Sequence, residues 1–166
     1  MTKTRIAING YGRIGRNLFR LLLNHPTIEV VAINDIADNK TMSHLTKYDS
    51  IHGVLPYDCT FDEKAIIVNG KSYSFSHERD ITNLPWKKHN VDIVIECTGK
   101  FKTFEDLNMH ITAGAKKVIL SAPSEVDSIK TVVLGVNDHI LDGSELIISN
   151  ASCTTNNAAP MLKVID

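Results

Sequence analysis

Apolar and polar positions alternate along the chain in blocks that predict strands and helices in turn. Residues 5–9 form an apolar run typical of a buried strand, and residues 14–24 have helical spacing. Pro26 ends that helix, and the β-branched run at 28–34 predicts a second strand. A strand, a helix and a strand in the first 35 residues imply a right-handed parallel crossover. The predicted helix places four apolar residues on one side: Ile14, Leu18, Leu21 and Leu22.

The rest of the chain continues this alternation. Asn69-Gly70 lies between two apolar runs and favours a two-residue hairpin turn, and Gly114 can supply a left-handed cap to the helix before it. The pattern predicts an α/β fold, namely a doubly wound, mostly parallel sheet of the Rossmann type with an antiparallel hairpin insert. The further elements expected are helices at 41–48 and 103–113 and strands at 65–68, 71–75, 91–96, 117–120, 131–134 and 146–148.

A glycine-rich loop connects the first predicted strand to the first helix. It reads GYGRIG over residues 10–15 and matches Gly-x-Gly-x-x-Gly. Gly10 allows a tight turn, Gly12 lets the backbone approach a pyrophosphate, and Gly15 lets the helix pack closely on the strand. The amino end of the helix also favours the charge of a phosphate. A tight turn without a ligand is the alternative, but the flanking strands and helix favour a dinucleotide site.

An aspartate follows the second predicted strand at the spacing of a dinucleotide site. Asp35 comes 20 residues after Gly15, where an acidic side chain accepts hydrogen bonds from a ribose hydroxyl. A carboxylate there would repel a 2′-phosphate, so we expect NAD rather than NADP as the cofactor. The alternative is a solvated aspartate at a strand end.

Cys153 lies where the last predicted strand gives way to a helix. Thr154, Thr155 and Asn156 are candidate caps for that helix, and residues 158–165 are helix formers or core residues. Unpaired amides and the dipole at a helix amino end stabilise a thiolate, and the same amides could hold an oxyanion. Cys153 is therefore a candidate nucleophile, with a small buried cysteine as the alternative.

The other two cysteines have structural interpretations. Cys97 closes an apolar strand and is expected in the core, and Cys59 is expected in a loop before the hairpin. Three cysteines without a Cys-x-x-Cys pair, and seven scattered histidines, suggest neither a disulfide framework nor a metal site.

Composition narrows the classes of function. The chain has 18 basic and 19 acidic residues among 166, and this net charge of −1 gives no electrostatic case for nucleic acid. No run approaches the ~18 apolar residues of a membrane span, and no leader opens the chain. We therefore expect a cytoplasmic protein without a membrane partner.

Several motifs occur in an order that resembles glyceraldehyde-3-phosphate dehydrogenase. They are INGYGRIGRN, YDSIHG, ERD, LPW, ECTG, KVILSAPS and SNASCTTNN, and they span nearly the whole chain. The resemblance implies that residues 1–150 are an NAD-binding domain and that residues 151–166 begin a catalytic domain. Besides Gly12 and Gly15 of the loop, it implies cofactor contacts by Asn9, Gly10, Arg13, Ile14, Asp35, Arg79, Thr98, Gly99 and Ser121.

The same resemblance implies a cysteine-based oxidation. Cys153 would attack the aldehyde of glyceraldehyde 3-phosphate, and the thiohemiacetal would pass a hydride to NAD. Inorganic phosphate would then release the thioester as 1,3-bisphosphoglycerate, the product of a glycolytic enzyme. Ser152 and Thr154 match contacts to substrate or phosphate.

The chain departs from this family in length, since it corresponds to the N-terminal half of a member. The catalytic histidine of the family follows the cysteine, whereas all seven histidines here precede Cys153. A nucleophile without its base loses most of its activation, so we expect little activity from this chain alone. The complete enzyme is expected to be a homotetramer. Two alternatives stay open: an NAD-binding or interaction module without catalysis, and erythrose-4-phosphate dehydrogenase.

Overall fold

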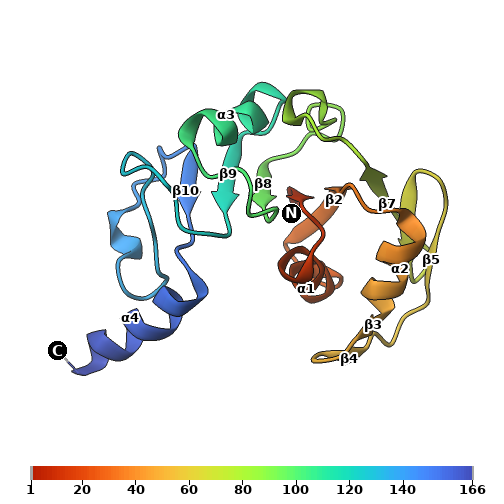
Figure 1. Cartoon of the computed structure of the whole chain (residues 1–166), viewed down its shortest axis with the longest axis horizontal. Coiled ribbons are helices and arrows are strands. Elements are labelled where there is room, and N and C mark those ends of the chain that lie inside the picture. Colours follow the sequence, from red (N-terminus) through yellow and green to blue (C-terminus); the bar gives the residue numbers. More distant parts are fainter. Residues whose placement is uncertain (1, 166) are drawn as a thin grey trace.

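The computed structural model describes residues 2–165, which form a curved sheet with helices on both faces (Figure 1). The helices are α1 (Arg13–Leu22), α2 (Asn39–Lys47), α3 (Phe104–Thr112) and α4 (Cys153–Ile165), with 3-10 turns at Ile81–Asn83 and Asp138–Ile140. The strands are β1 (Thr4–Asn9), β2 (Ile28–Asn34), β3 (Tyr48–Asp49), β4 (Gly53–Val54), β5 (Cys59–Phe61), β6 (Ala65–Val68), β7 (Lys71–Ser76), β8 (Ile93–Glu96), β9 (Lys117–Leu120) and β10 (Ile147–Ser149).

The order of the strands confirms the predicted fold class. The main sheet has eight strands in the order β10-β9-β8-β1-β2-β7-β6-β5, and β3 and β4 form a separate two-stranded sheet. The six strands from β10 to β7 are parallel, whereas β6 and β5 pair antiparallel. The order reverses at β1, from which the chain proceeds first to β2 and later to β8. In doubly wound sheets, ligands bind at the carboxyl end of such a switch point.

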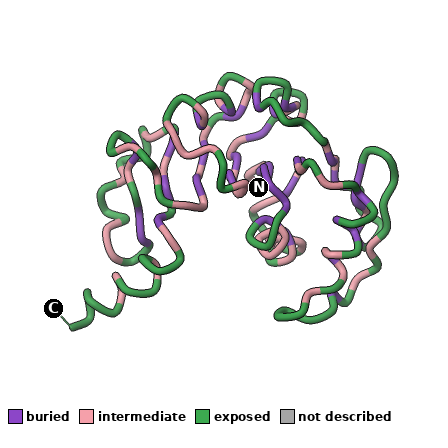
Figure 2. Tube along the Cα trace, viewed as in Figure 1, coloured by how far each residue is buried: buried purple, intermediate pink, exposed green. Residues whose placement is uncertain are grey.

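Two hydrophobic cores lie on opposite faces of this sheet, because successive strand residues point to opposite sides. Ala7 and Val94 belong to the core under α3, which also contains Trp86, whereas Ile6 and Ile8 belong to the core under α1 and α2. Figure 2 shows the buried residues concentrated along the strands.

The buried side of α1 differs from the predicted one. Ile14 and Leu21 are 57% and 78% exposed, whereas Gly15 and Phe19 are buried. Gly15 lies directly against the carbonyl oxygen of Gly10, since an added Cβ would collide with that atom. The close approach at Gly15 sets which side of the helix faces the sheet, and apolar spacing did not indicate it. The other two predicted residues are half-buried: Leu18 and Leu22.

The predicted strand at 131–134 is wrong. Thr131 makes one isolated parallel bridge to Ser149, Val132 and Val133 have no regular secondary structure, and a turn begins at Leu134. The Asn137 side chain takes the place of a strand partner: its Oδ1 accepts from the Val133 amide at 2.7 Å, and its Nδ2 donates to the Thr131 carbonyl at 3.0 Å. Val132 and Val133 are buried even so, which explains why the apolar run resembled a strand.

The hairpin insert has one strand more than expected. Asn69 and Gly70 have φ of 52° and 76°, as the predicted turn requires. Cys59 lies in β5 rather than in a loop and pairs with Val68 of β6. β5 is the outermost strand on this side of the sheet.

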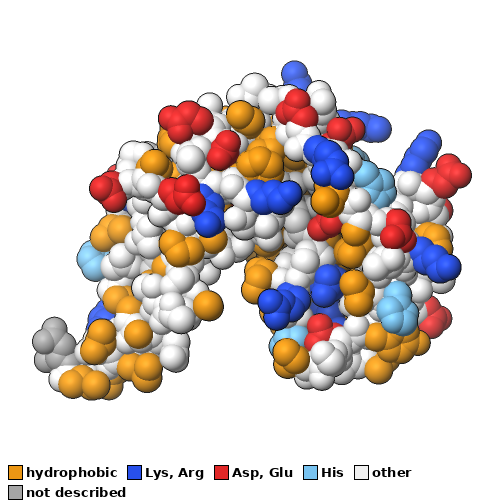
Figure 3. Space-filling view, viewed as in Figure 1, with side chains coloured by type: hydrophobic (Ala, Val, Ile, Leu, Met, Phe, Trp, Pro, Cys, Tyr) orange, Lys and Arg blue, Asp and Glu red, His pale blue; other side chains and the backbone are white. Residues whose placement is uncertain are grey.

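Helix α4 extends from the body of the molecule. Residues 158–165 belong to this helix, as helix formers would, but none of its residues is buried, so they do not act as core residues in the described structure (Figure 2). Hydrophobic side chains gather at its far end, and Figure 3 shows an open notch between α4 and the part of the molecule around α1. The most exposed of these side chains are Met161, Leu162, Val164 and Ile165.

Candidate functional site

A pocket of about 290 Å³ opens at the carboxyl ends of β1, β2, β7 and β8. It therefore lies at the switch point of the sheet, where the first helix and the loops after neighbouring strands converge. Its lining combines backbone, polar and apolar groups: Asn9, Gly10, Gly12, Asn34, Asp35, Ile36, Glu78, Arg79, Ile81, Leu84, Cys97, Thr98, Lys100 and Phe101.

The three loop glycines meet different constraints. Gly10 has φ of +90°, and a Cβ added there would lie 2.6 Å from the backbone nitrogen of Thr98. Gly15 is required by the close approach of α1 to the loop. Gly12 has φ of −70°, which any residue adopts, and a Cβ there would meet no atom within 4 Å. Nothing within the described chain explains a glycine at position 12, whereas a phosphate approaching the backbone would.

Asp35 connects the glycine loop to the segment after β2. Its Oδ2 accepts from the Tyr11 amide at 2.6 Å, and its Oδ1 accepts from the Ala37 amide at 3.0 Å. Each carboxylate oxygen can accept a second hydrogen bond. Asp35 is half-buried and lines the pocket, so a ribose hydroxyl could bind to it while the loop contacts persist.

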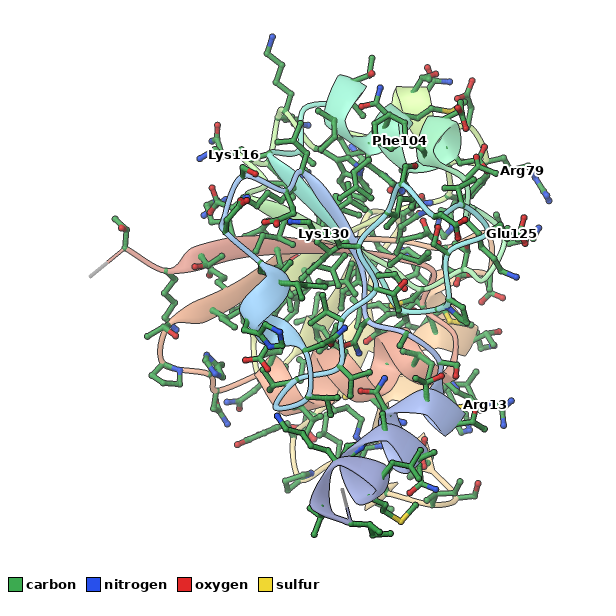
Figure 4. The ribbon with its side chains drawn as sticks, turned by 90° about the vertical axis from the view of Figure 1, so that its left-hand side faces the viewer. Arg13, Arg79, Phe104, Lys116, Glu125 and Lys130 are labelled. Atoms are coloured by element: carbon green, nitrogen blue, oxygen red, sulfur yellow. The ribbon has the colours of Figure 1, made fainter. Side chains whose placement is uncertain are left out.

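The structure brings some of the predicted cofactor residues together and leaves others outside the pocket. Arg13 and Arg79 both project toward the same side of the molecule in Figure 4, as expected for residues that follow parallel strands. Six predicted residues line the pocket: Asn9, Gly10, Gly12, Asp35, Arg79 and Thr98. Five do not: Arg13, Ile14, Gly15, Gly99 and Ser121.

Cys97 packs against the core under α1 and α2, as the sequence predicted, and it also lines the pocket. It is half-buried, and it lines the pocket just after β8. Burial raises the pKa of its thiol to about 11, with the nearby Ser121 side chain acting in the opposite direction. The thiol is therefore protonated near neutral pH and is a poor nucleophile. The other pocket residues missed lie near strand ends or in the following loops: Asn34, Ile36, Glu78, Ile81, Leu84, Lys100 and Phe101.

The junction of β10 and α4 exposes Cys153 at the start of a helix. Cys153 is the first residue of α4, and its side chain is exposed. The turn before it contains Ala151, which has φ of 59° and is buried. A positive φ at a residue other than glycine is costly, and such residues occur often at functional sites. The Ala151 amide donates to the Ser149 hydroxyl at 3.1 Å, which helps to hold this turn.

The residue that caps α4 is Ser152, not one of the three residues predicted. Its Oγ accepts from the Thr155 amide at 2.9 Å, and it lies 2.9 Å from the Thr154 hydroxyl. Ser152 and Thr154 thus flank Cys153, and the Ser152 hydroxyl also lies 2.6 Å from the Thr155 hydroxyl. Neither these residues nor Cys153 line the pocket at the switch point.

Across residues 2–165, His, Cys, Asp and Glu side chains form no group of three or more that could hold a metal ion. In this same part of the chain, no helix combines the length and apolar character needed to cross a membrane.

The parallel sheet, the glycine loop at its switch point and the acidic residue after β2 define a dinucleotide-binding domain of the Rossmann type. A match to one protein family narrows this class further. Residues 4–104 match the family model described as "Glyceraldehyde 3-phosphate dehydrogenase, NAD binding domain". The chain belongs to the glyceraldehyde-3-phosphate dehydrogenase family, and NAD is the cofactor of this family's domain.

Curated relatives agree with this assignment. The chain is 49% identical over 164 residues to glyceraldehyde-3-phosphate dehydrogenase 1 of Bacillus cereus, covering 98% of this chain and 49% of the relative. It is 51% identical over 162 residues to glyceraldehyde-3-phosphate dehydrogenase of Geobacillus stearothermophilus. This alignment covers 97% of this chain and 48% of the relative. The chain spans about half the length of the curated relatives it matches.

Proposed function

We propose that this chain binds NAD in the pocket at its switch point, as the cofactor domain of a phosphorylating glyceraldehyde-3-phosphate dehydrogenase. The observation that carries the proposal is the open space at Gly12, which neither the backbone conformation nor the packing of this chain requires. The residues present fit a dinucleotide. The glycine loop and the start of α1 would hold the pyrophosphate, and Asp35 would hold the adenosine ribose.

Arg79 is the proposed cationic group on the rim of this pocket. It follows β7 and is exposed, so its side chain can reach a bound nucleotide. Arg13, Ile14, Gly99 and Ser121 are proposed to contact parts of NAD that extend beyond the pocket, since they follow β1, β8 and β9 at the same edge of the sheet.

We propose Cys153 as the nucleophile of the complete enzyme. The amino end of α4 favours a negative charge, and the strained turn at Ala151 holds the thiol in an exposed position. Its Sγ would attack the aldehyde carbon of glyceraldehyde 3-phosphate to form a thiohemiacetal. Bound NAD supplies the acceptor for the hydride. Inorganic phosphate would then displace the thioester from Cys153 as 1,3-bisphosphoglycerate, with Ser152 and Thr154 contacting substrate or phosphate.

The boundary between the cofactor domain and the catalytic domain is proposed near residue 150, just before the turn at Ala151. A homotetramer and a cytoplasmic location stay predictions for the complete protein. We also propose that the 166-residue chain has little dehydrogenase activity, because a cysteine without a general base loses most of its activation.

Two measurements on the purified chain test these proposals. Isothermal titration with NAD and with ADP-ribose should show binding of both, and a lack of binding would refute the cofactor assignment. Incubation with glyceraldehyde 3-phosphate, NAD and phosphate should give negligible NADH absorbance. Appreciable NADH production that requires Cys153 would show that the chain is active by itself.

Two alternatives lead to different results. A binding or interaction module without catalysis predicts that Cys153→Ser leaves the function of the complete protein unchanged. Erythrose-4-phosphate dehydrogenase predicts a preference for erythrose 4-phosphate in assays of the complete protein. The names of the relatives favour glyceraldehyde 3-phosphate.

A further inference from the structure

A chain of buried polar side chains passes beneath the pocket and joins α3 to the ends of three adjacent strands. The Trp86 indole donates to His110 Nδ1 at 3.0 Å, and His110 Nε2 lies 3.0 Å from Glu96 Oε2. From the other side, Asn34 Nδ2 donates to Asn9 Oδ1 at 2.8 Å, and Asn9 Nδ2 donates to Glu96 Oε2 at 2.6 Å. All five residues are buried, and the side chains of His110 and Glu96 are fully inaccessible.

The direction of these hydrogen bonds is determined by their chemistry. An indole N–H can only donate, so His110 Nδ1 carries no proton and His110 Nε2–H donates to Glu96. Asn9 is oriented in the same way, because its carbonyl accepts from Asn34 and leaves its amide group to donate to Glu96. The carboxylate of Glu96 is thus the acceptor on which both branches end.

Glu96 also determines the hydrogen-bonding character of Thr98 in the pocket wall. Its Oε1 accepts from the Thr98 amide at 2.7 Å and from the Thr98 hydroxyl at 2.5 Å. The single hydroxyl proton of Thr98 therefore points to Glu96, and the Lys100 amide donates to the same hydroxyl at 3.1 Å. Toward a ligand, this hydroxyl can act only as an acceptor.

We propose that Glu96 is a positioning residue for the nucleotide site, which fixes the Thr98 hydroxyl as an acceptor for a donor group of the bound nucleotide, such as a ribose hydroxyl. Glu96 does not line the pocket, whereas Thr98 and Asn9 do, so it acts through them. This inference rests on the proposed binding of NAD and adds the residue that sets the polarity of one wall.

Glutamine at position 96 would keep the shape but reverse this polarity. Its amide has one oxygen and one NH₂ group, so it cannot accept on both sides. Asn9 and His110 cannot turn around without losing Asn34 and Trp86. The glutamine oxygen should therefore face Asn9 and His110, and its NH₂ should face Thr98. The Thr98 amide, which donates to Glu96 in the wild type, would lose its acceptor. The Thr98 hydroxyl would accept from glutamine and direct its proton at the ligand, where two donors would meet.

A double-mutant cycle on the affinity for ADP-ribose tests this inference. In the wild-type background, Thr98→Val removes an acceptor and should raise the dissociation constant at least about threefold. In the Glu96→Gln background, the same substitution removes a mismatched donor and should leave the affinity unchanged or improve it. Leu107→Ala provides the control background, since Leu107 is a buried residue of α3 that belongs to the apolar core. There, Thr98→Val should weaken binding as it does in the wild type.

The outcomes separate the two proposals. If the wild-type chain binds ADP-ribose but Thr98→Val has the same effect in both backgrounds, Glu96 is a structural residue and the inference is wrong. If the wild-type chain does not bind ADP-ribose, the proposed function fails and this inference fails with it. If Glu96→Gln does not fold, the affinities of Thr98→Ser and Thr98→Val for ADP-ribose test whether the Thr98 hydroxyl contacts the nucleotide. Serine must preserve the affinity and valine must reduce it, and equal affinities would overturn the inference.

Discussion

Replacing Gly12 with alanine should separate the stability of the domain from its affinity for NAD. Gly12 has φ of −70° and ψ of −159°, and an added Cβ meets no atom within 4 Å. Alanine stabilises such a site by about 0.4–1 kcal/mol through the unfolded chain. Gly12 is also the N-cap of α1, and alanine is poorer there by roughly 0.5 kcal/mol. The free energy of unfolding should therefore change by less than about 1 kcal/mol, or about 2–4 °C in Tm.

The affinity for NAD should respond strongly to the same substitution. The methyl group would occupy the space in which the pyrophosphate approaches the backbone, so we expect the dissociation constant to rise at least about tenfold, or ~1.4 kcal/mol. Isothermal titration gives the affinity, and thermal unfolding followed by circular dichroism gives Tm. Gly15→Ala is the matched control, since its Cβ collides with the Gly10 carbonyl and should destabilise the fold. The reasoning is refuted if Gly12→Ala binds NAD like the wild type, or if it loses as much stability as the control.

Three further predictions concern other parts of the structure. Asp35→Ala should weaken NAD binding and reduce the preference for NAD over NADP, because the carboxylate that repels a 2′-phosphate is gone. Titration with both cofactors measures this preference, and an unchanged ratio of the two affinities contradicts the ribose assignment. Iodoacetamide should alkylate exposed Cys153 long before Cys97 at neutral pH, because burial raises the pKa of Cys97 to about 11. Mass spectrometry should show labelling of Cys97 increasing as the pH rises toward that value, and equal rates at neutral pH would count against the structure. Gly114→Ala should lower the free energy of unfolding by roughly 1–3 kcal/mol. The cause is that Gly114 has φ of +110° and that its new Cβ would lie 2.5 Å from the Lys87 Cβ. An unchanged denaturant midpoint would contradict this predicted loss of stability.

The elements that could be predicted are those whose signals are local. The hairpin at Asn69-Gly70 and the cap at Gly114 depend on dipeptide and single-residue conformations, and the glycine loop depends on spacing within six residues. The errors occurred where one specific contact overrode the pattern of apolar residues. The run at 131–134 is buried but bonded by the Asn137 side chain rather than by a neighbouring strand along its length. The buried side of α1 depends on how closely Gly15 approaches the sheet.

In the candidate site, the sequence separation between partners limited what could be predicted. The sequence indicated the residues that belong to a contiguous fingerprint, such as Gly12, and the acidic residue at a fixed distance from it. It did not indicate Glu96, which was read as the end of an apolar strand. A charged residue is rarely fully buried without partners, so a glutamate in that run was a signal that could have been used. Its partner Asn9 could not have been named from the sequence, because Asn9 lies 87 residues away along the chain.

That separation has a consequence for the order of events during synthesis. The loop that would hold the pyrophosphate is made first, but its neighbour Asn9 has no acceptor until Glu96 has been translated and β8 has paired with β1. Contacts between residues so far apart in the chain form late in folding. A nascent chain should therefore bind the nucleotide only after the segment through Phe101 has left the ribosome. Retention of ribosome-bound chains on an immobilised nucleotide would then report completion of the segment through Phe101 rather than of the first βαβ unit.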